Sequence, residues 1–197
     1  TISDFAAKFK GGVRPNLFRV NINSSVVGFA DLEFLCKATT IPASVVGKVE
    51  VPYRGRKLQV PGDRTFEDWN ITLLNDTDWR NRSALEAWMA RIQGHTANYS
   101  AFGNDDISYY GQASVSQLDR QNNIIRTYRM ECFPTNVAAI TLDADTNDSV
   151  EEFEATFAVN YFTIDGAGLD GSQSGSGIDI SVSGNIGIGP VQVGFNF

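Results

Sequence analysis

Apolar and polar residues alternate along much of the first 162 positions, and this period-2 pattern predicts a chain built mainly of β-strands. Trp69, Ile71 and Leu73, for example, fall on one face of a predicted strand at 68–76. The other predicted strand regions are 14–22, 28–44, 45–62, 114–134, 136–143 and 151–162. The regions 45–62 and 114–134 each contain a turn, and the count of expected strands is about eight.

One segment has helical spacing instead. In residues 81–94 the apolar side chains recur every three or four positions, Gly94 is expected to end the helix, and an Asp or Asn just before it can cap the start. The region 45–62 reads as a long ribbon that turns at Arg54-Gly55 and ends at Pro61-Gly62. We therefore predict a mainly β fold, an antiparallel β-sandwich or half-open barrel with one flanking α-helix.

The composition changes after residue 162. Residues 1–162 form the predicted β domain, 163–177 are a Gly- and Ser-rich linker, and 178–197 alternate again as a C-terminal β-hairpin extension. A hairpin of this size buries too little apolar surface to be stable alone. It is expected to pack on its own domain or on a neighbouring subunit, or to stay unattached.

Charge is distributed unevenly along the chain. All 16 Lys and Arg residues lie within 1–129 beside 13 acids, a balance of +3, whereas 130–197 hold 10 acids and no Lys or Arg, a balance of −10, which together give −7. A protein that grips nucleic acid presents a basic patch. The acidic third of this chain is expected to repel DNA.

Targeting and redox signals are few. No apolar run reaches the roughly 20 residues that span a bilayer, so no membrane insertion is expected. The first residues lack the apolar core of a secretory signal. Cys36 and Cys132 are therefore expected to be reduced thiols that pack as small apolar side chains, although they could in principle pair.

The stretch 143–154 has the ligand spacing of a calcium-binding EF-hand loop, with oxygen-bearing side chains at positions 1, 3, 5, 7, 9 and 12. Its sixth position is Asp148, where such loops need Gly, and strand-like sequence flanks it where helices are required. We therefore expect an acidic turn between strands, and neither a metal nor any other cofactor is predicted.

Catalytic motifs are also weak. His95 is the single histidine, so a Ser-His-Asp or Cys-His arrangement would have to use it, and it follows a helix-ending Gly in a polar loop. No phosphate-binding GxxxxGK[ST] motif is present. The sequence predicts a protein that binds or builds, and not an enzyme.

Four blocks carry a family resemblance: RPNLF (14–18), CKATTIPAS (36–44), GRKLQVPGDRTFEDWNITLLND (55–76) and FPTNVAAITLDADTNDSVEEFEATFAVNYF (133–162). In their order and spacing the chain resembles the tail tube proteins of T4-like contractile-tailed bacteriophages across residues 5–162. The residues most specific to the resemblance are Gly62, Asp63, Arg64, Phe66, Trp69, Pro134 and Asn136. The related alternatives are the baseplate protein that initiates the tube and the Hcp-like tube proteins of injection systems.

The resemblance implies a structural virion protein that forms hexameric rings, stacked into a tail tube through which DNA is ejected. Composite barrels of more than roughly 16 strands enclose an aqueous channel, and closing a ring covers exposed strand edges. The implied partners are other copies of the chain, the sheath, the baseplate tube-initiator, the tape-measure protein and the tail terminator. Genomic DNA would pass through without specific binding, and assembly would take place in the host cytoplasm.

Two groups of charged residues become candidate contact sites under this implication. Lys48, Arg54, Arg56 and Lys57 of the ribbon are expected to contact acids of an adjacent ring, unless the ribbon is only a solvated basic hairpin. Asp143, Asp145, Glu151 and Glu152 are expected to face the lumen or a ring interface, unless they are solvated turn residues. A monomeric, calcium-linked β-sandwich binding module is the remote alternative.

Overall fold

The chain was analysed as a computed structural model that describes residues 1–165 except 10–11, 98 and 104–106. The described residues form eight strands and three helices. In chain order these are α1 (Ile2–Phe9), β1 (Phe18–Ser24), α2 (Leu32–Leu35), β2 (Cys36–Thr39), β3 (Ser44–Tyr53), β4 (Arg56–Phe66), β5 (Trp69–Leu74), α3 (Arg80–Ile92), β6 (Gly111–Leu118), β7 (Ile124–Val137) and β8 (Glu152–Asp165).

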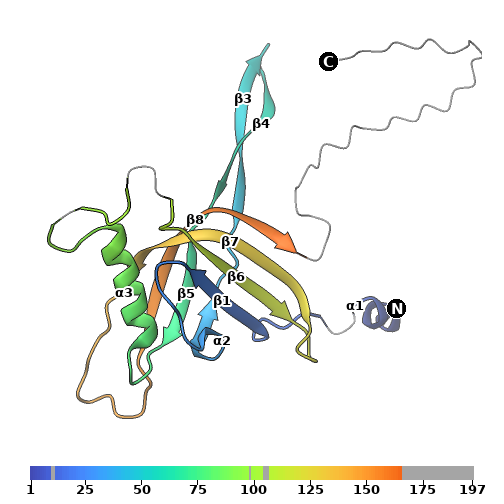
Figure 1. The fold of residues 1–197 in the computed structure, drawn as a ribbon. Helices are drawn as coiled ribbons and strands as arrows, with labels where there is room; N and C mark the ends of the chain where they lie inside the picture. The colour runs from blue at the N-terminus through green and yellow to red at the C-terminus, as the bar shows by residue number, and fades with distance from the viewer. Residues whose placement is uncertain (10–11, 98, 104–106, 166–197) are drawn as a thin grey trace, which may run out of the picture.

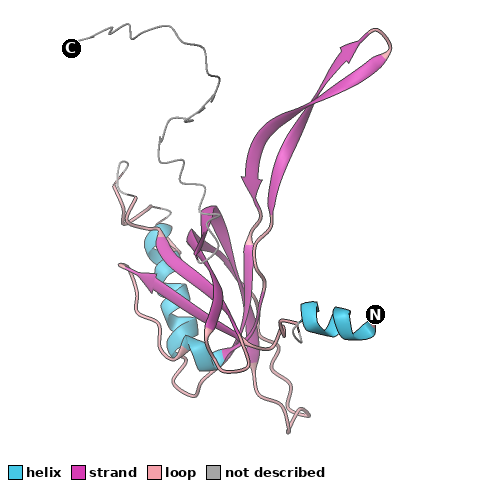
Figure 2. Cartoon of the chain, turned by 90° about the vertical axis from the view of Figure 1, so that its right-hand side faces the viewer, coloured by secondary structure: helices cyan, strands magenta, loops and turns pink. Residues whose placement is uncertain are grey.

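Six strands form one curled antiparallel sheet in the order β1-β6-β7-β8-β5-β2, and α3 packs beside it (Figure 1). Strands β3 and β4 pair only with each other and project from the sheet as a long hairpin (Figure 2). The mainly β fold with one main flanking helix is confirmed, as the half-open barrel rather than as two stacked sheets.

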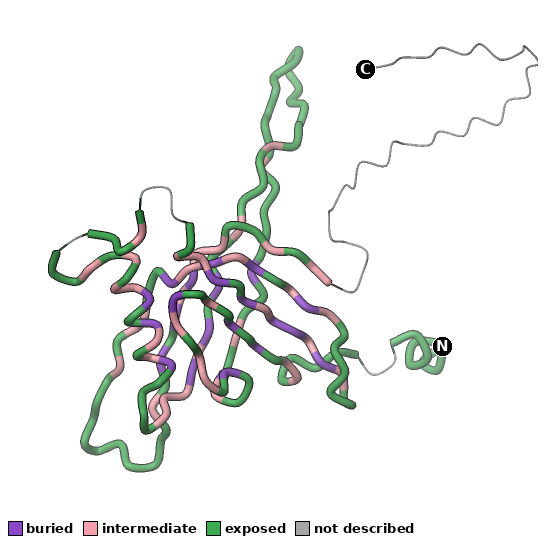
Figure 3. Tube along the Cα trace, viewed as in Figure 1, coloured by how far each residue is buried: buried purple, intermediate pink, exposed green. Residues whose placement is uncertain are grey.

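The core lies between the inner face of the curled sheet and α3. Trp69 and Trp88 are fully buried, and the Phe157 ring lies between them, with ring centroids 5.0 Å from Trp69 and 6.2 Å from Trp88. Burial of each such large side chain stabilises the fold by about 1.5–3 kcal/mol. Figure 3 shows that the buried positions follow the sheet and α3, whereas the hairpin is exposed along its length.

Two predicted strand regions are wrong in part. Within 28–44, the backbone turns at Asp31, which has a φ of 52°, and its carbonyl accepts hydrogen bonds from the amides of Phe34 and Leu35. This local bonding makes the short helix α2 and leaves Phe34 74% exposed. Region 136–143 is a strand only as far as Val137, because β8 pairs instead with the residues that precede it in β7.

The remaining element predictions differ mainly at their ends. Helix α1 was not predicted, and β4 continues past the expected end at Pro61-Gly62 to Phe66. Strand β8 runs to Asp165, so the first residues of the predicted linker belong to the sheet. The rest of that linker and the predicted hairpin at 178–197 lie outside the described residues. No helix in the described part of the chain is long and apolar enough to cross a membrane.

Candidate assembly surfaces

The outer face of the six-stranded sheet is rich in uncharged polar side chains along β1 and β6. On these strands Asn, Gln and Ser residues fall between buried apolar ones. Ser116 and Thr127 share a buried hydrogen bond of 2.9 Å. An open hollow of about 410 Å³ on this face is lined by Arg19 and Arg129, by Ala113 and Ile124, and by the polar residues Asn21, Asn23, Gln112, Ser114, Ser116 and Thr127.

Basic side chains on this polar face are neutralised locally. Arg19 pairs with Glu33 at 3.1 Å, Lys37 pairs with Glu152, and Arg129 pairs with Asp165. All six side chains are exposed, so these pairs add little to stability. Their effect is on the surface potential, because each positive charge has a carboxylate beside it.

The four candidate acids do not form one site. Glu152 lies on β8 and points to the polar face, since its neighbour Phe153 is buried in the core. The Glu151 carboxylate accepts a hydrogen bond from the Asn75 side chain at 3.2 Å, at the end of β5. Asp143 and Asp145 lie in the 138–151 loop, at the opposite end of the molecule from the hairpin (Figure 1). The structure therefore separates a sheet-face acid from end-loop acids.

The 138–151 loop is not arranged as an EF-hand. One Asp143 carboxylate oxygen accepts the backbone amide of Asp145 at 3.0 Å, and the other lies 3.4 Å from the Thr146 hydroxyl. Strand β8 follows the loop where a helix would be required. Among the residues that the structure describes, no group of three or more His, Cys, Asp or Glu side chains is placed to hold a metal.

The base of the hairpin explains several of the family-specific residues. A Cβ on Gly62 would lie 3.2 Å from the backbone of Gly47, so the two strands approach closely where their register shifts. Phe66, at the end of β4, packs edge-on against Phe162 of β8 with a centroid distance of 5.2 Å. The glycines let β3 and β4 approach closely, and the aromatic pair connects the hairpin to the sheet.

The remaining family-specific residues have separate places. The Trp69 indole donates a hydrogen bond of 3.0 Å to the Thr39 hydroxyl and so joins β5 to edge strand β2. Pro134 and Asn136 flank a bulge in β7, where the pairing with β8 shifts register. Asp63 and Arg64 are exposed on β4.

Of the four candidate basic residues, Arg54, Arg56 and Lys57 lie at the tip of the hairpin, and Lys48 lies nearer the base. The tip is a tight turn in which Arg54 and Gly55 both have positive φ, 45° and 81°, as a two-residue hairpin turn requires. The Arg54 guanidinium lies 5.4 Å from the centre of the Tyr53 ring. Lys57 donates to Glu50 at 2.6 Å, and this bond is the main reason the pKa of Glu50 is lowered.

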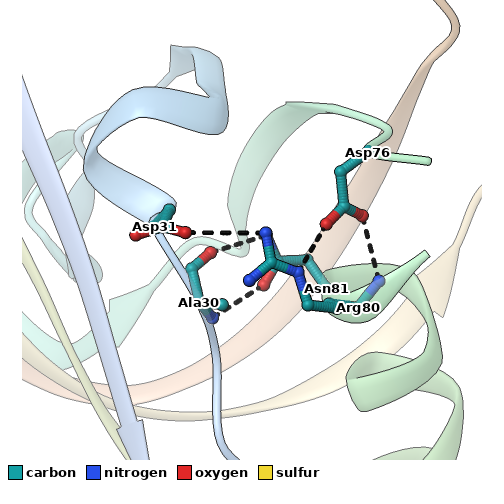
Figure 4. Close-up of polar contacts among 5 residues, drawn as sticks. All are labelled: Ala30, Asp31, Asp76, Arg80 and Asn81. Carbon is teal, nitrogen blue, oxygen red and sulfur yellow. Dashed lines mark hydrogen bonds and ion pairs between the residues drawn. The ribbon is translucent and has the colours of Figure 1, made fainter. Parts of the chain in front are cut away.

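A separate polar cluster fixes the loop that leads to edge strand β2 (Figure 4). Asn81 on α3 is 2% exposed; its amide donates to the Ala30 carbonyl at 2.9 Å and accepts from the Ala30 amide at 3.0 Å. Beside it, Arg80 lies 2.7 Å from Asp76 and 3.5 Å from Asp31. The N-cap position of α3 is Trp79, which makes no side-chain cap; Asp76, three residues earlier, accepts the Arg80 backbone amide at 3.0 Å.

The two cysteines and His95, which the sequence analysis considered for a disulfide or a catalytic role, have ordinary environments. Burial raises the pKa of Cys36 to about 11 and that of Cys132 to about 12, so both thiols are protonated at neutral pH. Neither forms a disulfide. His95 is exposed in the turn that follows α3.

The sequence reasoning missed two surfaces. The polar sheet face could have been found from the alternation RVNIN and QASVS, in which each polar residue falls between apolar ones. Helix α1 could have been found from Ile2, Phe5 and Phe9, which share one helical face. In both cases the signal lies in the spacing of common residue types and not in an unusual residue.

A curled sheet with a polar outer face, neutralised charges and a projecting hairpin defines a β-rich structural protein with surfaces suited to self-assembly. Residues 2–165 match the phage tail tube protein family, and the chain belongs to that family. It is 35% identical to tail tube protein gp19 of Enterobacteria phage T4 over 166 residues, which cover 82% of this chain and 98% of that protein. The corresponding protein of Enterobacteria phage T6 is 34% identical, with the same coverage.

Solved structures share the fold at low sequence identity. The sheath-tube complex of an extracellular contractile injection system contains a chain with a TM-score of 0.60 and 15% identity, covering 85% of this chain and 99% of that one. The tube-terminating cap of the anti-feeding prophage contains another, with a TM-score of 0.58 and 15% identity, covering 79% and 91%. These likenesses support the fold assignment alone.

Proposed function

We propose that this tail tube protein assembles as hexameric rings that stack into the tube of a phage tail, with the polar outer face of the sheet lining the channel. The observation that carries this orientation is the contrast between the sheet's two faces. One face is buried beneath α3, and the other is exposed and polar, and its basic side chains Arg19, Lys37 and Arg129 are paired with carboxylates. The chain acts as a structural component of the virion and not as a catalyst.

DNA would pass along this wall without being held. Each Lys or Arg that contacts phosphate adds salt-dependent affinity, and Arg19, Lys37 and Arg129 are each paired with a carboxylate. Glu152 contributes to this neutrality through Lys37. The partners proposed from the family are the sheath, the baseplate tube-initiator, the tape-measure protein and the tail terminator. Assembly would take place in the host cytoplasm.

Adding positive charge to the wall tests this role. In phage particles built from Asn21→Arg, Gln112→Arg subunits, DNA ejection should be slower than in wild type, and the delay should shrink as salt is raised. Ser83→Arg subunits provide the control, because Ser83 is exposed on α3, away from the polar face. If the wall variant ejects DNA as fast as the control at low salt, the polar face does not line the channel.

Ring stacking is proposed to use the two ends of the molecule. The hairpin tip carries Arg54, Arg56 and Lys57, and the loop at the opposite end carries Asp143 and Asp145. Head-to-tail stacking would bring these opposite charges together in adjacent rings.

Charge reversal tests this pairing. Arg54→Glu, Arg56→Glu subunits should remain as single rings in sedimentation, and Asp143→Lys, Asp145→Lys in the same chain should restore tubes. Asp119→Lys, which reverses the charge of an acid in the β6–β7 turn, is the control and should not restore tubes. Tubes that form with Asp143→Lys, Asp145→Lys but not with Asp119→Lys would identify the 138–151 loop as the partner. Equal tubes from wild type and the tip variant would contradict the proposal.

A further inference from the structure

The β3–β4 hairpin has one polar and one apolar face, and nothing in the described chain covers the apolar one. On the polar face, Glu50 accepts hydrogen bonds from Lys57 at 2.6 Å and from Gln59 at 2.9 Å. The apolar face is 39–65% exposed and consists of Val49, Val51, Tyr53, Leu58 and Val60. A two-stranded ribbon is marginally stable in water, so this strip needs a partner.

Helix α1 also has an exposed apolar face. Its apolar face is formed by Ile2, Phe5 and Phe9, which are 88%, 63% and 56% exposed, and none of its residues is buried. Phe5 and Phe9 stack on each other with ring centroids 5.3 Å apart. An isolated helix of eight residues is too short to be stable in water, so it too requires a surface to pack on.

The two strips do not meet in the described part of the subunit. Helix α1 lies to one side of the sheet, whereas the hairpin projects from its top, as Figure 1 shows. A second copy that is displaced along the direction of the hairpin would carry its α1 to the level of the hairpin of the first copy. This is the displacement that ring stacking requires.

The strips also agree in length. From Ile2 to Phe9 the helix rises about 10 Å, and from Val49 to Tyr53 a strand extends about 13 Å. The apolar face of α1 is therefore long enough to follow the apolar strip of the hairpin. Charge does not contribute to this match, because Asp4 in the first turn of α1 is already paired with the N-terminal amine at 2.9 Å.

We propose that α1 of one subunit packs along the apolar face of the β3–β4 hairpin of a subunit in the adjacent ring. The occupant of the hairpin face is thus a second copy of this chain. This contact rests on the proposed function, since it requires stacked rings. It assigns a role to α1, none of whose side chains is buried against the residues that the structure describes.

Cross-linking between copies tests the contact directly. Phe5→Cys protein and Leu58→Cys protein are mixed, allowed to assemble and treated with a short bismaleimide; the natural thiols are buried. Covalent dimers should form in the assembled mixture. Phe5→Cys mixed with Ser83→Cys, which exposes a thiol on α3, should give at least about tenfold less dimer. Equal cross-linking of the two mixtures would overturn the proposal.

A second measurement does not depend on new cysteines. Phe5→Ser, Phe9→Ser protein should fold with an unchanged melting temperature, because no residue of α1 is buried against the described part of its own chain. Its critical concentration for tube formation should rise about tenfold or more, since large aromatic residues dominate contact energies. Lys8→Ser, on the same helix but outside the apolar strip, is the matched control.

The outcomes separate this contact from the proposed function. If the wild-type protein forms no rings or tubes, the proposed function fails. If the wild-type protein forms tubes and the aromatic double variant assembles at the same concentration, only the α1–hairpin contact is wrong.

Discussion

The buried amide of Asn81 is expected to contribute more to stability than the charged network beside it. Asn81→Ala removes both hydrogen bonds to Ala30 and leaves the Ala30 N–H and C=O without those partners. Each bond is worth about 1 kcal/mol net, and an unsatisfied buried group adds a further penalty. We expect the free energy of unfolding to fall by about 2–4 kcal/mol.

Urea unfolding of dilute, unassembled protein measures this loss, since assembly would otherwise stabilise the fold by mass action. With a slope of about 2 kcal/mol/M, the midpoint should fall by about 1–2 M. Arg80→Ala is the matched control from the adjacent position, and its midpoint should fall less than that of Asn81→Ala because the Arg80 side chain is 49% exposed to solvent. If the two variants unfold at the same urea concentration, the Asn81–Ala30 hydrogen bonds do not contribute more to stability than the ion pairs of Arg80.

Three further outcomes follow from the packing and titration of the subunit. Gly111→Ala should destabilise the fold by about 1–3 kcal/mol in the same urea assay, because its Cβ would lie 2.5 Å from the Trp88 ring, whereas Gly28→Ala, with nothing within 4 Å, should not. The buried thiols of Cys36 and Cys132 should resist iodoacetamide at pH 8 in the folded protein and react after the protein is unfolded. Fast alkylation of these thiols in the folded protein would contradict their raised pKa values. The pKa of Asp119 is lowered, mainly by its bond to the Asn123 side chain, so the stability that this carboxylate contributes is present above the ordinary pKa of an Asp side chain and is lost as pH falls through the lowered pKa of the folded protein. Asp119→Asn should flatten this part of the stability–pH curve, and an unchanged curve would exclude the contribution.

Strand alternation predicted most of the sheet because burial on one face follows directly from period-2 spacing. Trp69, Ile71 and Leu73 are all fully or almost fully buried on β5, as their spacing indicated. The same rule failed at Phe34, where two local hydrogen bonds to the Asp31 carbonyl form a helical turn that the alternation does not reveal. Local backbone bonding overrode the side-chain pattern there.

The assembly surfaces were harder to predict for a different reason. The ribbon and its turn at Arg54-Gly55 follow from turn chemistry, and the structure contains both. Which acids share a surface depends on how β7, β8 and β5 pair, and that pairing separates Glu152 from Asp143 although they lie in one short stretch. The role of α1 depends on a neighbouring copy, which one chain's spacing does not specify.

The central claim is that this chain builds a hollow tube with the polar face of its sheet inward. Cryo-electron microscopy of the purified, assembled protein tests it most directly. We expect stacked rings in which Asn21 and Gln112 face the channel and α3 lies on the outside. A tube whose channel is lined by α3, or protein that stays monomeric at every concentration, would contradict the account.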